Sequence, residues 1–170
     1  IRCETSFLKN TFPVQGDFEQ IEQVVINILL NAMEAVKASE NPTIRVRLER
    51  TSGGSIQLVI SDNGHGISRE NIEKIFVPFY STKKNGSGIG LPMARQVMKM
   101  HQGDIIISSG KDDVTQFVLV FHSISHASFH PLYLWCLSGH LKYKPDTYFH
   151  SSILLSRFKI PGNRTSLLSL

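Results

Sequence analysis

Apolar and polar residues recur with two different periods along this chain. Between residues 17 and 36 the apolar side chains fall three or four positions apart, which is the spacing of one face of an amphipathic helix. Asp17 with Gln20 has the spacing of a capping box at its start, and Asn41-Pro42 would end it. A second helix is predicted over 91–100, with Pro92 in its first turn. The apolar face of the first helix consists of Phe18, Ile21, Val25, Ile28, Leu29, Ala32 and Val36.

Strand patterns lie on either side of these helices. Residues 43–49 alternate strictly, and residues 55–62 form a nearly continuous apolar run after the turn Ser52-Gly53-Gly54. Two further strands are predicted at 104–109 and 115–121, a short helix at 68–75, and a short strand near the start. This order predicts an α+β fold, a two-layer α/β sandwich with a mainly antiparallel, mixed sheet and helices on one face only.

Composition sets the domain organisation. With 170 residues, 41% hydrophobic and 19% charged, the chain suits one globular domain, which we place at 1–121, followed by an unassigned, poorly ordered extension at 122–170. The formal net charge of +4 belongs to that extension, which has five basic residues and one acid. The first 121 residues are balanced and show no basic face, so nucleic-acid binding is not expected. No apolar run is long enough to span a bilayer, so no membrane contact is expected from this segment.

A polar stripe runs along the first helix, opposite its apolar face. At 100° per residue, five positions fall within about 80° of one another. The stripe is either a solvated surface or the lining of a cleft. Amide side chains favour the cleft, because asparagine is a poor helix former and its oxygen suits a hard cation such as Mg²⁺. The positions are Gln20, Gln23, Asn27, Asn31 and Glu34.

A carboxylate beside two glycines follows the strand at 55–62, in the string Asp62-Asn63-Gly64-His65-Gly66. A carboxylate accepts a hydrogen bond from an exocyclic amine and repels a carbonyl oxygen at the same place, which selects adenine over guanine. Taken alone, the string is equally typical of an ordinary Asp-Asn-Gly turn.

A glycine-rich loop, residues 86–90, opens the second helix. Its backbone N–H groups and the helix N-terminus suit a phosphate, and Lys83 and Lys84 stand just before it. It is neither the loop of a doubly wound fold nor a Walker loop, because no parallel βαβ unit precedes it and no Gly-Lys-Ser/Thr follows.

Together these motifs resemble the ATP-binding domain of bacterial sensor histidine kinases, in the superfamily shared with gyrase, Hsp90 and MutL. Residues 23–32 resemble the N box, 62–66 the G1 box, 75–79 the F box and 86–91 the G2 box, in the family's order. The resemblance covers about residues 14–121. The strings at 31–35 and 79–83 are most similar to the nitrogen-regulation branch of these kinases.

The resemblance implies a Bergerat-type fold and ATP with Mg²⁺ as ligands. By position, Asn31 would bind Mg²⁺ and through it the phosphates, and Asp62 would hold the adenine amine. Thr82, Lys83 and the 86–90 loop would form part of a lid over the phosphates. The implied ATP-binding residues are Asn27, Asn31, Asp62, Gly64, Gly66, Ile67, Phe79, Thr82, Lys83, Gly86, Ser87, Gly88, Ile89, Gly90 and Leu91.

Asn27 stands where the ATP-hydrolysing relatives place a water-activating glutamate, and an amide is a far weaker base. We therefore expect transfer of the γ-phosphate to a histidine on a dimerising helical hairpin, a segment that residues 1–16 cannot contain. No catalytic residue is expected within the chain itself. The alternatives are a conformational ATPase of the Hsp90 or MutL type and a nucleotide-binding module without transferase activity.

The resemblance also implies partners and a location. These are the phosphoacceptor hairpin of the parent kinase, the receiver domain of a response regulator, and a cytoplasmic position within a parent protein that can be membrane-anchored. His65, in a glycine turn, and His101, near a helix end, are interpreted as structural or incidental. A zinc site built from His122, His126, His130, Cys136 and His140 is conceivable but lacks a paired ligand motif.

Overall fold

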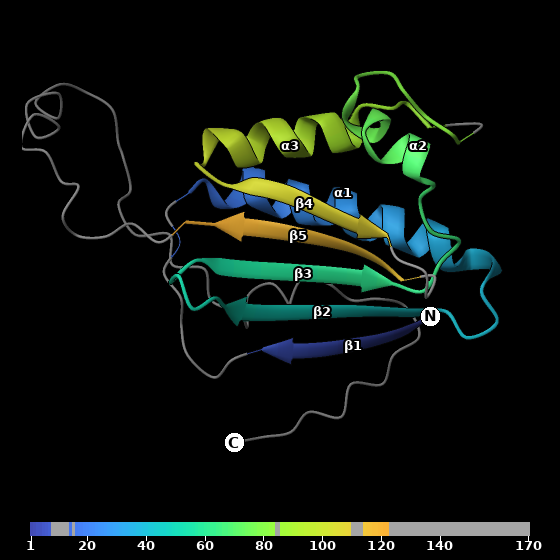
Figure 1. Cartoon of the computed structure of the whole chain (residues 1–170), viewed down its shortest axis with the longest axis horizontal. Helices are drawn as coiled ribbons and strands as arrows, with labels where there is room; N and C mark the ends of the chain where they lie inside the picture. The colour runs from blue at the N-terminus through green and yellow to red at the C-terminus, as the bar shows by residue number, and fades with distance from the viewer. Residues whose placement is uncertain (8–13, 15, 84–85, 110–113, 123–170) are drawn as a thin grey trace, which may run out of the picture.

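The chain folds into a five-stranded mixed sheet with helices on one face (Figure 1). The computed structural model describes residues 1–7, 14, 16–83, 86–109 and 114–122. The strand order is β1-β2-β3-β5-β4; β1 runs parallel to β2, and the remaining neighbours are antiparallel. The strands are β1 (Arg2–Phe7), β2 (Thr43–Arg50), β3 (Ile56–Asp62), β4 (Asp104–Ser109) and β5 (Thr115–Phe121). The predicted mixed, mainly antiparallel sheet is confirmed.

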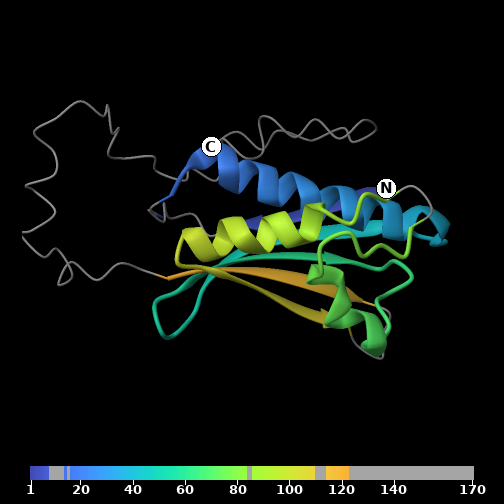
Figure 2. The same ribbon diagram turned by 90° about the horizontal axis from the view of Figure 1, so that it is seen from above.

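Two long helices cover the sheet, lying side by side on the same face (Figure 2). The core lies between the layers and joins Ile21 and Ile28 of α1 to Leu58 and Ile60 of β3 and Leu119 of β5, each at most 1% exposed. The helices are α1 (Phe18–Ala35) and α3 (Gly90–Met100), with the short pieces η1 (Val36–Ala38), α2 (Arg69–Ile72) and η2 (Lys74–Phe76). The two-layer prediction is therefore confirmed.

The start of α1 is fastened to the end of α3. Asp17 caps α1, since its Oδ1 accepts the Gln20 N–H at 3.1 Å. The capping box is not reciprocal, because the Asp17 N–H donates to Nε2 of His101 at 2.9 Å instead of to the Gln20 side chain. His101 Nε2 must then be unprotonated, so Nδ1 carries the proton and donates to the Val97 carbonyl at 2.7 Å. This agrees with the structural role predicted for His101.

Some predicted boundaries shift. The helix predicted to end at Asn41-Pro42 changes to the tighter η1 after Ala35, and the helix predicted at 68–75 is the four-residue α2 followed by η2. No helix in the described part of the chain is long and apolar enough to cross a membrane. The extension at 122–170 and the zinc hypothesis lie outside the described residues except for His122.

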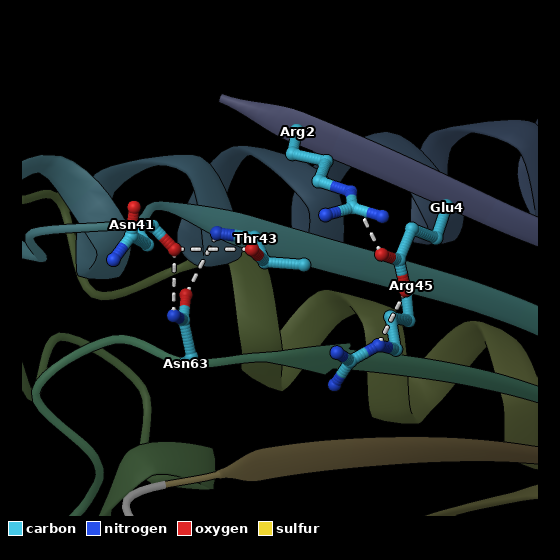
Figure 3. A network of polar contacts seen from close by, with 6 residues as sticks. All are labelled: Arg2, Glu4, Asn41, Thr43, Arg45 and Asn63. Atoms are coloured by element: carbon cyan, nitrogen blue, oxygen red, sulfur yellow. Dashed lines mark hydrogen bonds and ion pairs between the residues drawn. The ribbon is translucent and has the colours of Figure 1, made fainter.

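The same end of the molecule collects three chain segments. α1 ends, β3 ends and α3 begins there, and residues 77–83 and 86–89 lie beside the start of α3 (Figure 1). At the edge of the sheet formed by β1, Glu4 ties β1 to β2: its carboxylate pairs with Arg2 at 2.9 Å and with Arg45 of β2 at 2.6 Å (Figure 3). The candidate site is therefore built where helix ends and a strand end meet.

Candidate functional site

Asp62 is the last residue of β3 and is 3% exposed. Strand alternation puts it on the same face as Leu58 and Ile60, the face that the helices cover. Its Oδ1 accepts the N–H of Gly64 at 2.9 Å, which leaves Oδ2 for a donor from outside the chain. Burial raises the pKa of this carboxyl, and the Gly64 N–H and His65 oppose the rise. The site thus holds one buried carboxylate at a fixed place.

The loop after Asp62 lies directly against the last turn of α1. A Cβ on Gly64 would sit 2.6 Å from the backbone carbon and the Cβ of Ala35, so only glycine fits there. Gly66 has φ +73°, and the following N–H, that of Ile67, donates to Ser109 Oγ at 3.0 Å. We call residues 62–67 the Asp62 loop. Its path is set by α1 on one side and β4 on the other.

Asn63 locks the Asp62 loop to the start of β2 (Figure 3). Its Oδ1 accepts the Thr43 N–H at 2.7 Å and its Nδ2 donates to the Asn41 carbonyl at 2.8 Å. The Ser39 hydroxyl donates to the Asn63 carbonyl at 2.9 Å. Sequence reasoning assigned no role to Asn63, because Asp-Asn-Gly is common in turns; the roles of its side chain depend on Asn41 and Thr43, more than 19 positions earlier in the chain.

The polar face of α1 forms a chain of amide hydrogen bonds. Gln23 Nε2 donates to Asn27 Oδ1 at 3.3 Å, and Asn27 Nδ2 donates to the Gly90 carbonyl at 3.4 Å. Asn31 Nδ2 donates to the Asn27 carbonyl at 2.9 Å, so its Oδ1 is turned away from the helix backbone. The predicted stripe therefore faces the start of α3, and Asn31 presents an oxygen.

The ammonium group of Lys83 already contacts the Asn31 oxygen. Lys83 Nζ is 2.7 Å from Asn31 Oδ1 and 2.9 Å from Glu34 Oε2. The hydrogen bond from Lys83 is the main reason that the pKa of Glu34 is lowered. An amide oxygen that binds an ammonium group also suits a hard metal ion. Glu34 belonged to the predicted polar stripe but was not predicted as a site residue; its position on the same helix face was the available sign.

Residues 77–83 and 86–89, which we call the lid segment, lie between η2 and α3. Phe79 has φ +66° and is 80% exposed, and its N–H donates to the Gly88 carbonyl at 3.0 Å. Gly88 also has φ +66°, and a Cβ there would meet the carbonyl carbon of Phe79 at 2.6 Å. The Tyr80 hydroxyl donates to Asn71 Oδ1 at 2.6 Å. The two ends of the lid segment are thus held together by the contact between Phe79 and Gly88, and most of its described residues are exposed.

The structure brings some of the predicted site residues into direct contact and leaves others apart. Asn27 meets Gly90, and Asn31 meets Lys83. Ile67 and Leu91 pack against the core. The residues that lie exposed on the lid segment are Phe79, Thr82, Gly86, Ser87 and Ile89.

Among the described residues, the surroundings of the Asp62 loop include a pocket but no preformed cluster of metal ligands. An open pocket of about 400 Å³ adjoins it, lined by Ala35, Ala38, Ser39, Glu40, Asn41, Asn63, Gly64 and His65. No group of three or more His, Cys, Asp or Glu side chains in the described part of the chain is arranged to hold a metal ion.

Comparison with known proteins agrees with this architecture. Residues 16–124 match the family described as "Histidine kinase-, DNA gyrase B-, and HSP90-like ATPase". Among curated proteins, the C4-dicarboxylate transport sensor protein DctB of Rhizobium meliloti is 40% identical over 100 residues, 59% of this chain and 16% of that protein. The signal transduction histidine-protein kinase AtoS of Escherichia coli is 39% identical over 97 residues, 57% of this chain and 16% of that protein. The chain therefore spans about a sixth of the length of these relatives.

Solved structures give the same result. The mycobacterial sensor histidine kinase MprB is 28% identical with a TM-score of 0.60, covering 71% of this chain and 80% of that one. The catalytic domain of histidine kinase ThkA is 30% identical with a TM-score of 0.59, covering 70% of this chain and 78% of that one. The similarity to the nitrogen-regulation branch stays a prediction. The chain belongs to the histidine kinase-, DNA gyrase B- and HSP90-like ATPase family, and it is an ATP-binding catalytic domain of the sensor histidine kinase kind.

Proposed function

We propose that this domain, ending near residue 121, binds ATP with Mg²⁺ and presents the γ-phosphate to a histidine on a helical hairpin of its parent kinase. The observation that carries the proposal is the convergence of three elements at one end of the fold. The ribbon brings the end of α1, the end of β3 and the start of α3 to this end (Figure 1). There Asp62 is buried, Asn31 turns an amide oxygen away from its helix, and Lys83 of the lid segment contacts that oxygen.

The adenine end is assigned to the Asp62 loop. Asp62 Oδ2 would accept the exocyclic amine of adenine, while Oδ1 stays bonded to the Gly64 N–H. A buried carboxylate discriminates strongly, because a carbonyl oxygen placed there would face an unpaired negative charge. Gly64, packed against Ala35, and Gly66, turned at φ +73°, fix the path of the backbone against which the ring would lie, and Ile67 would add an apolar contact.

The phosphate end is assigned to α1, the lid segment and the start of α3. Asn31 would hold Mg²⁺ through Oδ1, an oxygen that already accepts a hydrogen bond from the Lys83 ammonium group. Bound there, the metal would neutralise phosphate charge and take its other ligands from water and phosphate oxygens. Lys83 would contact the phosphates, and the N–H groups at the start of α3 would face them. Residues Thr82 and Gly86 to Leu91 would line this end.

Asn27 favours transfer over hydrolysis. Its Nδ2 donates to the Gly90 carbonyl and its Oδ1 accepts from Gln23, so the side chain is used in holding α1 to α3. A neutral amide held in this way is a poor general base for water. Catalysis would then depend on positioning the γ-phosphate in line with an imidazole supplied by another segment. The receiver domain of a response regulator would take the phosphoryl group next.

The first test measures ATP affinity by titration calorimetry with Mg²⁺ present. Asp62→Asn should weaken binding on the order of 100-fold, because a charge-assisted hydrogen bond to a buried group is lost. Asp104→Asn is the matched control. Asp104, on β4, pairs with Lys99 of α3 at 2.8 Å, and its substitution should leave the ATP affinity unchanged. Equal affinities for the Asp62 variant and the wild type would refute the adenine assignment.

The second test asks what happens to the phosphate. The chain is incubated with γ-labelled ATP and a separately purified helical hairpin from a related kinase. Label on the hairpin histidine supports the proposal. Steady release of free phosphate without the hairpin would show a hydrolase instead, and binding without either product would show a nucleotide-binding module.

A further inference from the structure

We propose that Lys83 occupies the metal-binding oxygen of Asn31 in the nucleotide-free domain, and that Glu34 is the positioning residue that keeps it there. The inference rests on the proposed function, because it concerns the same oxygen that would hold Mg²⁺. It adds Lys83 as a competitor of Mg²⁺ for that oxygen and assigns a role to the carboxylate of Glu34.

The contacts of Lys83 converge from one side of α1. Asn31 and Glu34 are three positions apart and so lie on the same helix face, one above the other. Lys83 reaches both, with Nζ at 2.7 Å from Asn31 Oδ1 and 2.9 Å from Glu34 Oε2, although it lies about 50 positions later in the chain. One ammonium group thus joins a neutral oxygen to a charged one, as a cation in a two-ligand site does.

The orientation of Asn31 makes this contact specific. Its Nδ2 donates to the Asn27 carbonyl at 2.9 Å, so the side chain cannot flip without losing that bond. Oδ1 is therefore the atom that any cation would meet. The same orientation is the one required of a metal ligand.

The backbone near Lys83 is held in a turn that supports this reach. The Lys83 N–H donates to Ser81 Oγ at 3.1 Å, and the Gly86 N–H donates to the Lys83 carbonyl at 3.2 Å. The lysine side chain is 34% exposed and that of Glu34 is 48% exposed. The pair can therefore separate without unfolding anything else.

A lysine and a divalent ion cannot share Asn31 Oδ1 without strong repulsion, because two positive charges would lie within a few ångströms of each other. Lys83 must leave this oxygen when the nucleotide arrives with its metal. Glu34 then has two opposing effects. Its charge attracts any cation, and its pairing with Lys83 holds a competitor in place.

The test separates these two effects through the gain in ADP affinity that Mg²⁺ provides. For each variant of the full chain, calorimetry gives the Kd for ADP in EDTA and in saturating Mg²⁺, and the ratio of the two is the magnesium gain. Glu34→Gln should increase the gain about threefold, the size expected of a partly exposed ion pair. Lys83→Met should increase it by at least as much.

The double variant decides the mechanism. In the Lys83→Met background, Glu34→Gln should leave the gain unchanged or lower it, because only the attraction of Glu34 for cations remains to be lost. Glu19→Gln, which removes an exposed carboxylate in the first turn of α1, is the matched control and should leave the gain unchanged.

A direct readout needs no nucleotide. Acetylation of Lys83 by acetic anhydride, followed by peptide mass spectrometry, should be slower than that of the exposed Lys74 and should become faster in Glu34→Gln. Two results would overturn the inference. One is acetylation of Lys83 at the same rate in the wild type and in Glu34→Gln; the other is a magnesium gain that Glu34→Gln does not raise in the chain that keeps Lys83. If the wild type bound no ADP under either condition, the proposed function would fail first and this inference with it.

Discussion

The Asp62 loop and the lid segment are both rich in glycine, yet they are held in opposite ways. The Asp62 loop is fixed from three sides, by Ala35 of α1, by Thr43 of β2 and by Ser109 of β4. The lid segment is fixed mainly by contacts with itself, such as that between Phe79 and Gly88, and reaches the rest of the domain through a few polar side chains. Asp62 is 3% exposed, whereas Phe79 is 80% exposed.

This difference suits the two ends of one nucleotide. A base pocket gains selectivity when its groups are fixed before the ligand arrives, because little ordering remains to be done on binding. A phosphate lid must instead open and close, and such segments come from the less stable part of a fold. We therefore expect substitutions at the packed positions of the Asp62 loop to change global stability, and substitutions in the lid segment to change ligand binding with little effect on global stability.

The largest difference is expected for Gly64→Ala. The new methyl group would lie 2.6 Å from backbone and side-chain atoms of Ala35, and neither can move without shifting α1. The free energy of unfolding should fall by about 2 kcal/mol or more. Gly86→Ala is the control in the lid segment: its methyl group would meet the Ser81 hydroxyl and lie 3.0 Å from the Lys83 Cβ. Both residues belong to the lid segment itself, so the strain can be relieved locally and the global change should stay within about 0.5 kcal/mol. Urea denaturation measures both, and equal losses would contradict the comparison.

A smaller loss is expected for Asn63→Ala. The variant removes both side-chain bonds of Asn63 and leaves the Thr43 N–H unpaired, which should cost about 1–2 kcal/mol of unfolding free energy (Figure 3). Asn71→Ala is the matched amide on the lid side, where the partner is the Tyr80 hydroxyl. Its effect should be smaller, since that hydroxyl can turn to water. Thermal unfolding of the two variants gives the order, and the reverse order would count against a rigid Asp62 loop.

Asp62→Asn should raise stability slightly while it weakens ATP binding. Burial raises the pKa of Asp62 in the folded chain, so the folded chain holds this proton more tightly than the unfolded chain. The contribution of Asp62 to stability therefore falls as the pH rises from the ordinary aspartate pKa through the raised one. The asparagine variant avoids this loss and keeps an oxygen for the Gly64 N–H.

The corresponding measurement is Tm against pH for Asp62→Asn and wild type. The variant should have the higher Tm at neutral pH, and the difference should fade as the pH drops below the ordinary aspartate pKa. Asp104→Asn should behave in the opposite way, since Lys99 lowers the pKa of Asp104 and its loss removes a favourable pair at neutral pH. A lower Tm for Asp62→Asn at neutral pH would contradict the pKa argument.

The smallest effect on stability is expected for Gly88→Ala. The residue has φ +66° and touches the backbone of Phe79 and Tyr80, so alanine would be strained by roughly 1–2 kcal/mol. The lid segment should relieve that strain locally, so global unfolding changes little while ATP binding weakens about tenfold, the equivalent of such strain. Gly53→Ala, in the open hairpin between β2 and β3, should change neither quantity. A large loss of global stability in Gly88→Ala would show that the lid segment is part of the rigid frame.

The sequence predicted most of the fold because two periods dominate it. The repeat of three and four residues over α1 and the alternation over β2 follow directly from which side chains face the core, so helices, strands and the one-sided layer could be predicted. The capping box was only half right. The Gln20 N–H bonds Asp17 as expected, but the Asp17 N–H bonds His101, which lies 84 positions away. No local pattern records such a partner.

The candidate site divides in the same way. The sequence by itself determined which residue types are available: a carboxylate after a strand, amides one helical turn apart, and glycines where backbone must turn. Those follow from local chemistry and from resemblance to a family. Only the tertiary structure decided how they are used, with Asn63 as a clamp on β2, Asn27 as a tether to Gly90, and Lys83 paired with Glu34 on the oxygen of Asn31. These contacts join residues 20 to 63 positions apart, and the packing of α1 against α3 and the sheet sets them.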